Sequence, residues 1–299
     1  MRFAIATIDP YIGVFEAFLA AGWKPYKLFT VPIRNPMDSH DKVLALAEQQ
    51  GAKVQLSRMT RRDLEELRDN GCEALVVASY NHKIPDWQPY LKYAVNFHPS
   101  PLPEARGPYP LVRAIMERRT TWGITCHRLA PEMDAGEILA AENFPMQIDE
   151  THESLRFKLQ MAAGRLATQV AGQFTDLWDR AQPQTDGSYW PRWDHFDRVI
   201  NFATSVESIK CHIRAFGFVE SLVLLSNQEV LTIKHAVGWA EAHSYTPGHI
   251  VRADGKLLVI AARDGYIGIL EWQFAPPNVA AEIQAKLTTQ NLHKTGTQR

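Results

Sequence analysis

The chain has 299 residues, which is enough for one large domain or two domains of ordinary size. Hydrophobic residues make up 45% of it and charged residues 22%, a balance that excludes a disordered or collagen-like chain. The 32 Lys and Arg residues against 33 Asp and Glu residues leave a formal net charge of -1, so no basic excess indicates binding to nucleic acid or to a membrane surface.

Strands and helices alternate in the first half of the chain. Apolar runs predict strands at residues 2–8, 26–31, 53–56, 74–78 and 93–97. Apolar residues at helical spacing predict helices between them, at residues 11–21, 38–51 and 61–69. This alternation favours an α/β fold, a Rossmann-like and mainly parallel sheet with helices on both faces. In such a sheet, ligands bind beyond the carboxyl ends of the strands.

The second half of the chain has a different pattern. Residues 155–178 are expected to form one long helix, and residues 206–216 a short one. Asp-Gly pairs at residues 254–255 and 264–265 lie between apolar runs and are strong hairpin signals. We therefore expect an α/β domain at residues 1–181, a linker at 182–204 and a small antiparallel β-barrel of OB-like type at 205–299.

The three cysteines, Cys72, Cys126 and Cys211, are far apart and odd in number. This excludes a disulfide framework and a Cys-x-x-Cys metal site, and reduced thiols are typical of a cytoplasmic protein. The apolar run at residues 3–8 is too short for a signal peptide, and an acidic residue follows it directly. No stretch approaches the roughly 18 apolar residues of a membrane-spanning helix, so we expect no membrane partner.

A polar and proline-rich segment follows the strand predicted at residues 93–97. Asn96 and His98 are two residues apart, so their side chains share one face of an extended chain. Pro99, Pro101 and Pro103 then restrict three φ angles, which stiffens the loop beside them. Such a loop suits a preorganised site. The same residues would also suit a surface loop with polar groups that cap the backbone.

A second segment, residues 122–139, is predicted to form a strand, a tight turn and another strand. The turn carries Asp134 and Gly136. A carboxylate in a turn is most often only a turn former. In a functional site, the same carboxylate would orient a histidine and favour its charged form.

These two segments resemble the formyltransferase family that uses 10-formyltetrahydrofolate. The first motif is Asn96-x-His98 followed by Ser100-x-Leu102-Pro103-x-x-Arg106-Gly107. The second is Gly123-Ile124-Thr125 leading to Asp134-x-Gly136, at the expected separation. Residues 213–216 and 247–251 are similar to the C-terminal barrel of methionyl-tRNA formyltransferases. The resemblance covers most of the chain and makes residues 1–181 the catalytic domain.

The resemblance implies a mechanism with 10-formyltetrahydrofolate as co-substrate. An amine attacks the formyl carbon, and negative charge builds up on the formyl oxygen. Asn96 would donate a hydrogen bond to that oxygen, and His98 in its charged form would stabilise it. Asp134 would keep the imidazole charged and relay the proton that the amine loses.

The resemblance also implies binding residues for both substrates. Folate would contact Tyr80, Asn81 and His82 on one side, the loop residues Ser100, Pro101, Leu102 and Pro103, and the residues Ala130, Pro131, Glu132 and Met133 around the pterin. Arg106 and Gly107 would bind the acceptor.

Two other kinds of site are disfavoured. No Gly-x-Gly-x-x-Gly follows the first predicted strand, so a nicotinamide dinucleotide is not expected. His82, His98 and His127 together with Asp134 match no metal-ligand spacing, and the resemblance implies no metal.

Four functions are compatible with these residues. The favoured one is an N-formyltransferase that acts on a small-molecule amine, such as an amino sugar nucleotide or a hydroxyornithine-like compound. The alternatives are a methionyl-tRNA formyltransferase, a formyltetrahydrofolate hydrolase that passes the formyl group to water, and a silent folate-binding module. The presence of Asn96, His98 and Asp134 argues against a silent module.

Charge separates the two kinds of acceptor. In tRNA formyltransferases a basic insertion loop follows the second strand, and the barrel is basic. Here residues 31–42 hold two basic and two acidic residues, and residues 205–299 hold nine Lys or Arg against eight Asp or Glu. Attraction to phosphates dominates nucleic-acid affinity, so this balance favours a small amine over tRNA.

Overall fold

The computed structural model describes residues 1–32, 38–255 and 257–295, which form two compact units. The first unit comprises Met1–Pro110, Thr120–Met146 and Leu155–Pro191, and the second comprises Leu111–Arg119, Gln147–Ser154 and Arg192–Arg299. The segment expected as a linker, residues 182–204, therefore contributes to both units.

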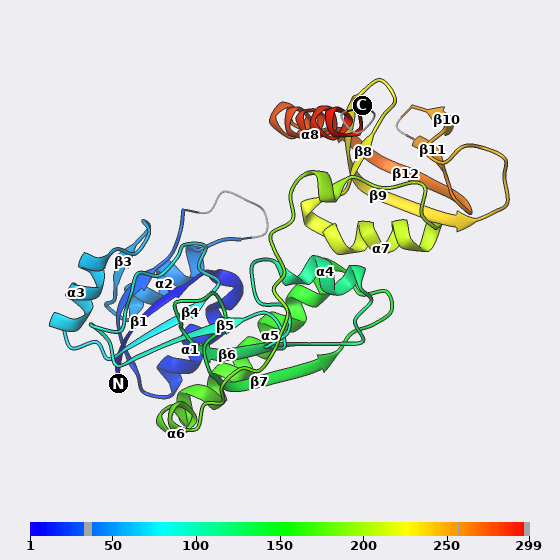
Figure 1. Ribbon diagram of the computed structural model, residues 1–299. Coiled ribbons are helices and arrows are strands. Elements are labelled where there is room, and N and C mark those ends of the chain that lie inside the picture. Colours follow the sequence, from blue (N-terminus) through cyan, green and yellow to red (C-terminus); the bar gives the residue numbers. More distant parts are fainter. Residues whose placement is uncertain (33–37, 256, 296–299) are drawn as a thin grey trace. The chain divides into compact units, whose positions relative to one another are not determined.

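The first unit is built on a seven-stranded sheet (Figure 1). Its strands are β1 (Arg2–Thr7), β2 (Lys24–Phe29), β3 (Lys53–Gln55), β4 (Ala74–Ala78), β5 (Tyr93–His98), β6 (Thr121–Arg128) and β7 (Ile138–Pro145). They lie in the order β3-β2-β1-β4-β5-β6-β7. Strands β1 to β5 pair in parallel, and β6 pairs antiparallel with both β5 and β7. The predicted mainly parallel sheet is confirmed.

Helices cover both faces of this sheet, as predicted. They are α1 (Ile12–Ala20), α2 (Asp41–Gln49), α3 (Arg61–Asp69), α5 (His152–Gly172) and α6 (Phe174–Asp179). On one face of β1, Phe3 packs against Phe15 and Phe18 of α1. On the other face, Ala4 belongs to a buried cluster with Leu64 of α3. Neighbouring residues of a strand point to opposite faces, so β1 is buried on both sides.

The long helix expected at residues 155–178 is two helices in the structure. Helix α5 begins earlier, at His152, and ends at Gly172, and α6 begins at Phe174. This break lets the ring of Phe174 pack edge-on against Trp23 and Tyr93, with ring centroids 4.9 and 5.2 Å apart. Burial of an aromatic ring favours the break.

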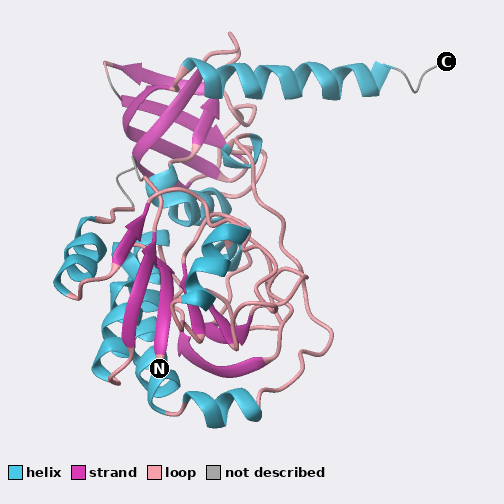
Figure 2. Ribbon diagram, turned by 90° about the vertical axis from the view of Figure 1, so that its left-hand side faces the viewer, coloured by secondary structure: helices cyan, strands magenta, loops and turns pink. Residues whose placement is uncertain are grey.

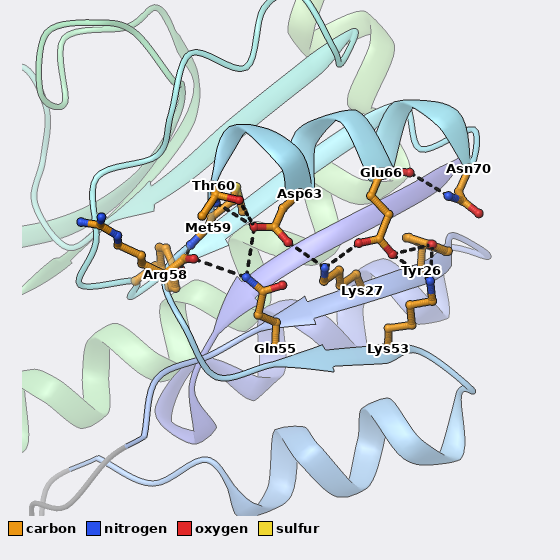
Figure 3. A network of polar contacts seen from close by, with 11 residues as sticks. Tyr26, Lys27, Lys53, Gln55, Arg58, Met59, Thr60, Asp63, Glu66 and Asn70 are labelled. Carbon is orange, nitrogen blue, oxygen red and sulfur yellow. Dashed lines mark hydrogen bonds and ion pairs between the residues drawn. The ribbon is translucent and has the colours of Figure 1, made fainter.

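A network of ion pairs joins α3 to β2 and β3 (Figure 3). The ammonium of Lys27, a residue that is 5% exposed, donates to Asp63 at 2.9 Å and to Glu66 at 2.8 Å. Burial acts to raise the pKa of Asp63, but hydrogen bonds from Thr60 and Lys27 lower it to about 2. Hydrogen bonds from Lys27 and Lys53 lower the pKa of Glu66 to about 2. Both carboxylates therefore depend on the buried Lys27 for compensation of their charge.

We expect Lys27→Met to lower the free energy of unfolding by about 2 kcal/mol, because Asp63 then lacks the cation buried beside it. Urea unfolding at pH 7 measures this change. A second change, Asp63→Asn, should restore part of the lost free energy, since it removes the uncompensated charge. An unaltered free energy of unfolding in Lys27→Met would contradict the prediction.

The second unit contains an antiparallel sheet, as predicted. The sheet has five strands, in the order β10-β11-β12-β9-β8. Its strands are β8 (Leu222–Leu224), β9 (Val230–Ala240), β10 (Ile250–Asp254), β11 (Leu257–Ala262) and β12 (Gly265–Phe274). Helix α7 (Val206–Phe216) coincides with the predicted helix. Figure 2 also shows α8 (Pro277–Thr295), which sequence reasoning missed. Its Val279 and Ile283 are buried in a cluster with Leu222 and Val230.

The two hairpins predicted from Asp-Gly pairs exist, but their turns differ. In the first, Asp254 pairs with Leu257, and Gly255 has a φ of +59°. Residue 256 lies outside the described residues. In the second, Gly265 is already paired with Ala262, so Arg263 and Asp264 form the turn. Gly265 is required by close packing, since a Cβ there would lie 2.2 Å from the carbonyl oxygen of Trp239. The carboxylate of Asp264 accepts a hydrogen bond from the backbone of Val206, at the start of α7.

Helix α4 (Pro110–Met116) places Ile115 in the second unit, where its carbonyl oxygen accepts a hydrogen bond from the thiol of Cys211. The three cysteines are buried and carry free thiols. Among the helices that the structure describes, none is both long enough and apolar enough to cross a membrane.

Candidate active site

Asn96 and His98 lie at the carboxyl end of β5, where the parallel strands of the first unit end. Val95 and Phe97 are buried in the core, with exposures of 0% and 1%. Because strand side chains alternate, Asn96 and His98 share the opposite face. His98 is buried and Asn96 is half-buried.

The turn between β6 and β7 places Asp134 beside them. Asp134 has a φ of +54°, a left-handed conformation, and a Cβ at Gly136 would lie 2.0 Å from the carbonyl oxygen of Arg128. The Oδ2 atom of Asp134 lies 3.5 Å from Nδ1 of His98, and its Oδ1 atom accepts a hydrogen bond from Nδ2 of Asn96 at 3.4 Å. The three residues of the two sequence motifs therefore converge in one cluster.

His127 completes this cluster from β6. It is 1% exposed and pairs directly with Asn96 across the antiparallel strands. Its Nε2 atom lies 3.2 Å from Nδ2 of Asn96 and 3.6 Å from Oδ1 of Asp134. Its Nδ1 atom lies 2.8 Å from the carbonyl oxygen of Arg128 and must carry a hydrogen, because a carbonyl only accepts. Sequence reasoning considered His127 only as a metal ligand and missed this position.

Burial and charge set the protonation of the cluster. Burial acts to raise the pKa of Asp134, but the nearby imidazole rings of His127 and His98 lower it to about 2, so the carboxylate is ionised. Burial lowers the pKa of His98, and Asp134 together with the carbonyl of Ala105 offsets this only in part. His98 is therefore neutral at pH 7, which differs from the charged form expected for it at the outset.

The position of the hydrogen on neutral His98 follows from its contacts. Its Nε2 atom lies 3.0 Å from the carbonyl oxygen of Ala105, which accepts a hydrogen bond, so Nε2 carries the hydrogen. The lone pair of Nδ1 then faces the carboxylate of Asp134. This arrangement leaves Nδ1 able to accept a proton next to a negative charge.

The loop after β5 is held by hydrogen bonds to its own backbone and to β6. The hydroxyl of Ser100 donates to the carbonyl oxygen of Glu104 at 2.8 Å. The hydroxyl of Thr125 on β6 donates to the carbonyl of Ser100 at 2.8 Å and accepts from the backbone N–H of Leu102 at 3.1 Å. Ser100 and Leu102 are buried, so they shape the loop from within.

Arg106 and Gly107 close this loop against residues 184–190. The Nε atom of Arg106 donates to the side-chain oxygen of Gln184 at 2.9 Å. Its Nη2 atom donates to the carbonyl oxygen of Thr185 at 3.2 Å. Gly107 has a φ of +104°, and a Cβ there would lie 2.4 Å from the carbonyl oxygen of Trp190, so a larger residue does not fit. The backbone N–H of Gly107 donates to the carboxylate of Asp134 at 3.0 Å.

Two family models match the chain. Residues 34–171 match the model described as formyl transferase, and residues 194–282 match the model described as formyl transferase, C-terminal domain. Together these matches cover more than two thirds of the chain, and the first includes the cluster around His98. The chain belongs to the formyltransferase family.

Individual relatives agree with this family. The methionyl-tRNA formyltransferase of Pseudothermotoga lettingae is 29% identical over 179 residues, which are 60% of this chain and 59% of the relative. Among solved structures, HypX from Aquifex aeolicus has a TM-score of 0.63 and 18% identity over 92% of this chain, which spans 45% of HypX. The N-formyltransferase from Helicobacter canadensis has a TM-score of 0.67 and 17% identity, with 91% of this chain and 99% of that chain covered.

The segments expected to bind folate in this formyltransferase lie near the same end of the sheet. Tyr80 follows β4, and its hydroxyl accepts a hydrogen bond from the backbone N–H of Met59 at 2.8 Å. Tyr80 and Leu129, which precedes the segment 130–133, both pack against the cluster on the α3 face. Asn81, His82 and residues 131–133 are exposed. Their roles in folate binding stay a prediction.

The residues considered as metal ligands are only partly brought together. His98 and His127 both approach Asp134, whereas His82 is exposed and contacts the ring of Tyr80. Within residues 1–32, 38–255 and 257–295, no group of three His, Cys, Asp or Glu side chains could hold a metal ion.

Proposed function

We propose that this protein is an N-formyltransferase that moves a formyl group from 10-formyltetrahydrofolate to an amine of a small-molecule acceptor. The observation that carries this proposal is the cluster at the end of β5, where the ionised Asp134 lies 3.5 Å from His98 and 3.4 Å from Asn96. The Helicobacter canadensis structure supports the choice of substrates, since it is described as a complex with folinic acid and dTDP-3-aminofucose.

The resting protonation of the cluster suits attack by an amine. The amine nitrogen bonds to the formyl carbon, and the formyl oxygen takes the negative charge while Asn96 donates a hydrogen bond to it. The proton lost by the amine passes by way of Asp134, directly or through water, to the neutral Nδ1 of His98. The resulting imidazolium stabilises the oxyanion and then returns the proton to the folate nitrogen that leaves.

The acceptor is inferred from charge in the second unit. Five of its cations pair with carboxylates of the same unit: Lys210 and Arg214 with Glu207, Lys234 with Glu220, Arg252 with Asp254, and Lys286 with Asp194. Pairing with carboxylates weakens the attraction of these five cations for phosphates, which favours a small acceptor over tRNA. In the segment after β2, residues 33–37 lie outside the described residues, and Asp38 pairs with Arg156 at 2.6 Å. An amino sugar nucleotide or a hydroxyornithine-like amine fits these charges better than tRNA does.

We expect formyl transfer to a small amine to change by less than about threefold between 50 and 200 mM salt. A tRNA acceptor with about six phosphate contacts should instead lose roughly a thousandfold in affinity over this range. Initial rates at subsaturating acceptor, measured at several salt concentrations, give the slope. A steep slope with methionyl-tRNA would contradict the proposed acceptor.

Methionyl-tRNA is the second candidate acceptor, because the relatives are named methionyl-tRNA formyltransferase. One experiment separates the candidates. The protein is incubated with 10-formyltetrahydrofolate and, in turn, a panel of amines, methionine-charged initiator tRNA and water alone, and formyl products are detected by mass. Transfer to an amine supports the proposal, transfer to tRNA replaces it with the second candidate, and release of formate alone indicates a hydrolase.

A further inference from the structure

Gln184 lies on a segment that is anchored on both sides to the site. On one side, Gln182 and Ile138 exchange backbone hydrogen bonds of 2.8 and 2.9 Å at the start of β7. On the other, the backbone N–H of Arg106 donates to the carbonyl of Ser188 at 2.9 Å, and that of Trp190 donates to the carbonyl of Arg106 at 2.7 Å. The segment is therefore held beside both the Asp134 turn and the loop after β5.

The carboxamide of Gln184 uses all three of its polar positions in the site. Its Nε2 atom donates to the carbonyl oxygens of Asp134 and Gly136, at 2.8 and 2.7 Å. Its Oε1 atom accepts from Nε of Arg106 at 2.9 Å. These partners determine the orientation of the amide, because a rotated amide would place its oxygen against two carbonyls and its N–H groups against a guanidinium.

The two carbonyls that Gln184 holds belong to the turn that aims the carboxylate. Asp134 has a left-handed φ of +54°, a conformation that costs a non-glycine residue free energy and persists only where its surroundings hold it. Inside the turn, the N–H of Ala135 donates to Glu132 at a long 3.4 Å. The hydrogen bonds from Gln184 are shorter, so they restrain the turn from outside.

We propose that Gln184 is a positioning residue, which holds the Asp134 carboxylate against His98 and ties it to Arg106. This inference rests on the proposed function for its effect on rate, but not for its effect on the geometry of the cluster. It assigns Arg106 two contacts within the protein, through Nε to Gln184 and through Nη2 to the carbonyl of Thr185.

The test compares two substitutions at this position. Gln184→Met keeps the length of the side chain and removes all three hydrogen bonds. Gln184→Glu keeps an acceptor for Arg106 but loses both donors to the Asp134 turn. We expect both variants to lower kcat by about tenfold or more, since displacement of a reacting group by about 1 Å costs up to a hundredfold, and to change KM for the folate by less than about threefold.

Titration of the His98 imidazole by NMR provides a readout that needs no activity. Asp134 raises the pKa of His98, so a displaced carboxylate should lower that pKa in Gln184→Met. Gln184→Glu adds a carboxylate that acts in the opposite direction, so its readout is kcat. The spectrum of His98→Ala assigns the signal. Gln182→Met is the matched control, because the exposed side chain of Gln182 donates to the carbonyl of Arg180.

Each outcome has one meaning. An unchanged titration and an unchanged kcat in Gln184→Met would overturn the positioning role. A wild-type kcat in Gln184→Glu beside a lowered kcat in Gln184→Met would also overturn it, because the contact with Arg106 alone would then be sufficient. Loss of rate equal to that of Gln182→Met would also overturn it. If the wild type transfers no formyl group to any acceptor, the proposed function fails, while the titration still decides the role of Gln184. Thermal unfolding of each variant identifies loss of folding.

Discussion

Replacing His98 with alanine should lower kcat for formyl transfer by about a hundredfold or more. The substitution removes the group that takes the proton from the amine and that carries positive charge beside the oxyanion. His98 is 5% exposed. Among the contacts described for it, Nδ1 faces the Asp134 carboxylate and Nε2 faces the carbonyl oxygen of Ala105. Single-turnover and steady-state rates with a saturating amine acceptor measure the effect.

His98→Ala should lower the free energy of unfolding by little more than the cost of the lost hydrogen bond to the carbonyl of Ala105, which is about 1 kcal/mol. His235→Ala is a suitable control, because His235 is an exposed residue of β9. Near-normal turnover in His98→Ala would refute the proposed role of the imidazole. A variant that unfolds would be recognised by its urea transition, and His98→Asn would then replace it.

Asp134→Asn should lower kcat by about a hundredfold and shift the pH profile toward acid. The negative charge of Asp134 raises the pKa of His98, so its removal lowers that pKa further below the ordinary value. The reaction needs neutral His98 at the start, and the imidazole then stays neutral to a lower pH. The acid limb of the profile of kcat/KM should therefore move to lower pH, while the maximum falls because the imidazolium formed during the reaction lacks its partner.

Asparagine keeps an oxygen that accepts from the backbone N–H of Gly107, which Asp134 binds at 3.0 Å. Folate binding, measured by calorimetry, should accordingly stay within about threefold of the wild type. An acid limb that stays in place, or moves to higher pH, would show that Asp134 does not act through His98. Unchanged kcat would exclude a role of the carboxylate in proton transfer.

Much of the architecture was predictable because the elements have local causes. Buried strands read as apolar runs, and the strands of the parallel sheet carry such runs on both faces. The hairpin at Asp254-Gly255 followed from turn chemistry, with Gly255 at a positive φ. The break between α5 and α6 was not predictable from periodicity, because its cause is the packing of Phe174 against Trp23, which is 151 residues away in the chain.

The same division applies to the site. Asn96 and His98 were singled out by their spacing and the prolines after them, and Asp134 by its turn, but only the family resemblance favoured a catalytic role over a structural one. His127 was missed because its position opposite Asn96 depends on the register between β5 and β6. Thr125 and His127 are two residues apart and so share one face of β6, which was the available signal. Only the pairing register places His127 opposite Asn96.

The amino-acid sequence alone determined the fold class, the family resemblance and the residues at the end of β5, because periodicity, turn chemistry and motif spacing are local properties of the chain. Tertiary structure alone decided the protonation of the cluster and the restraint on its geometry. Burial makes His98 neutral beside the ionised Asp134, and burial is a property of the packed core. Gln184 reaches Asp134 across 50 residues of chain, and such a contact exists only once the sheet, the turn and the following segment have packed together.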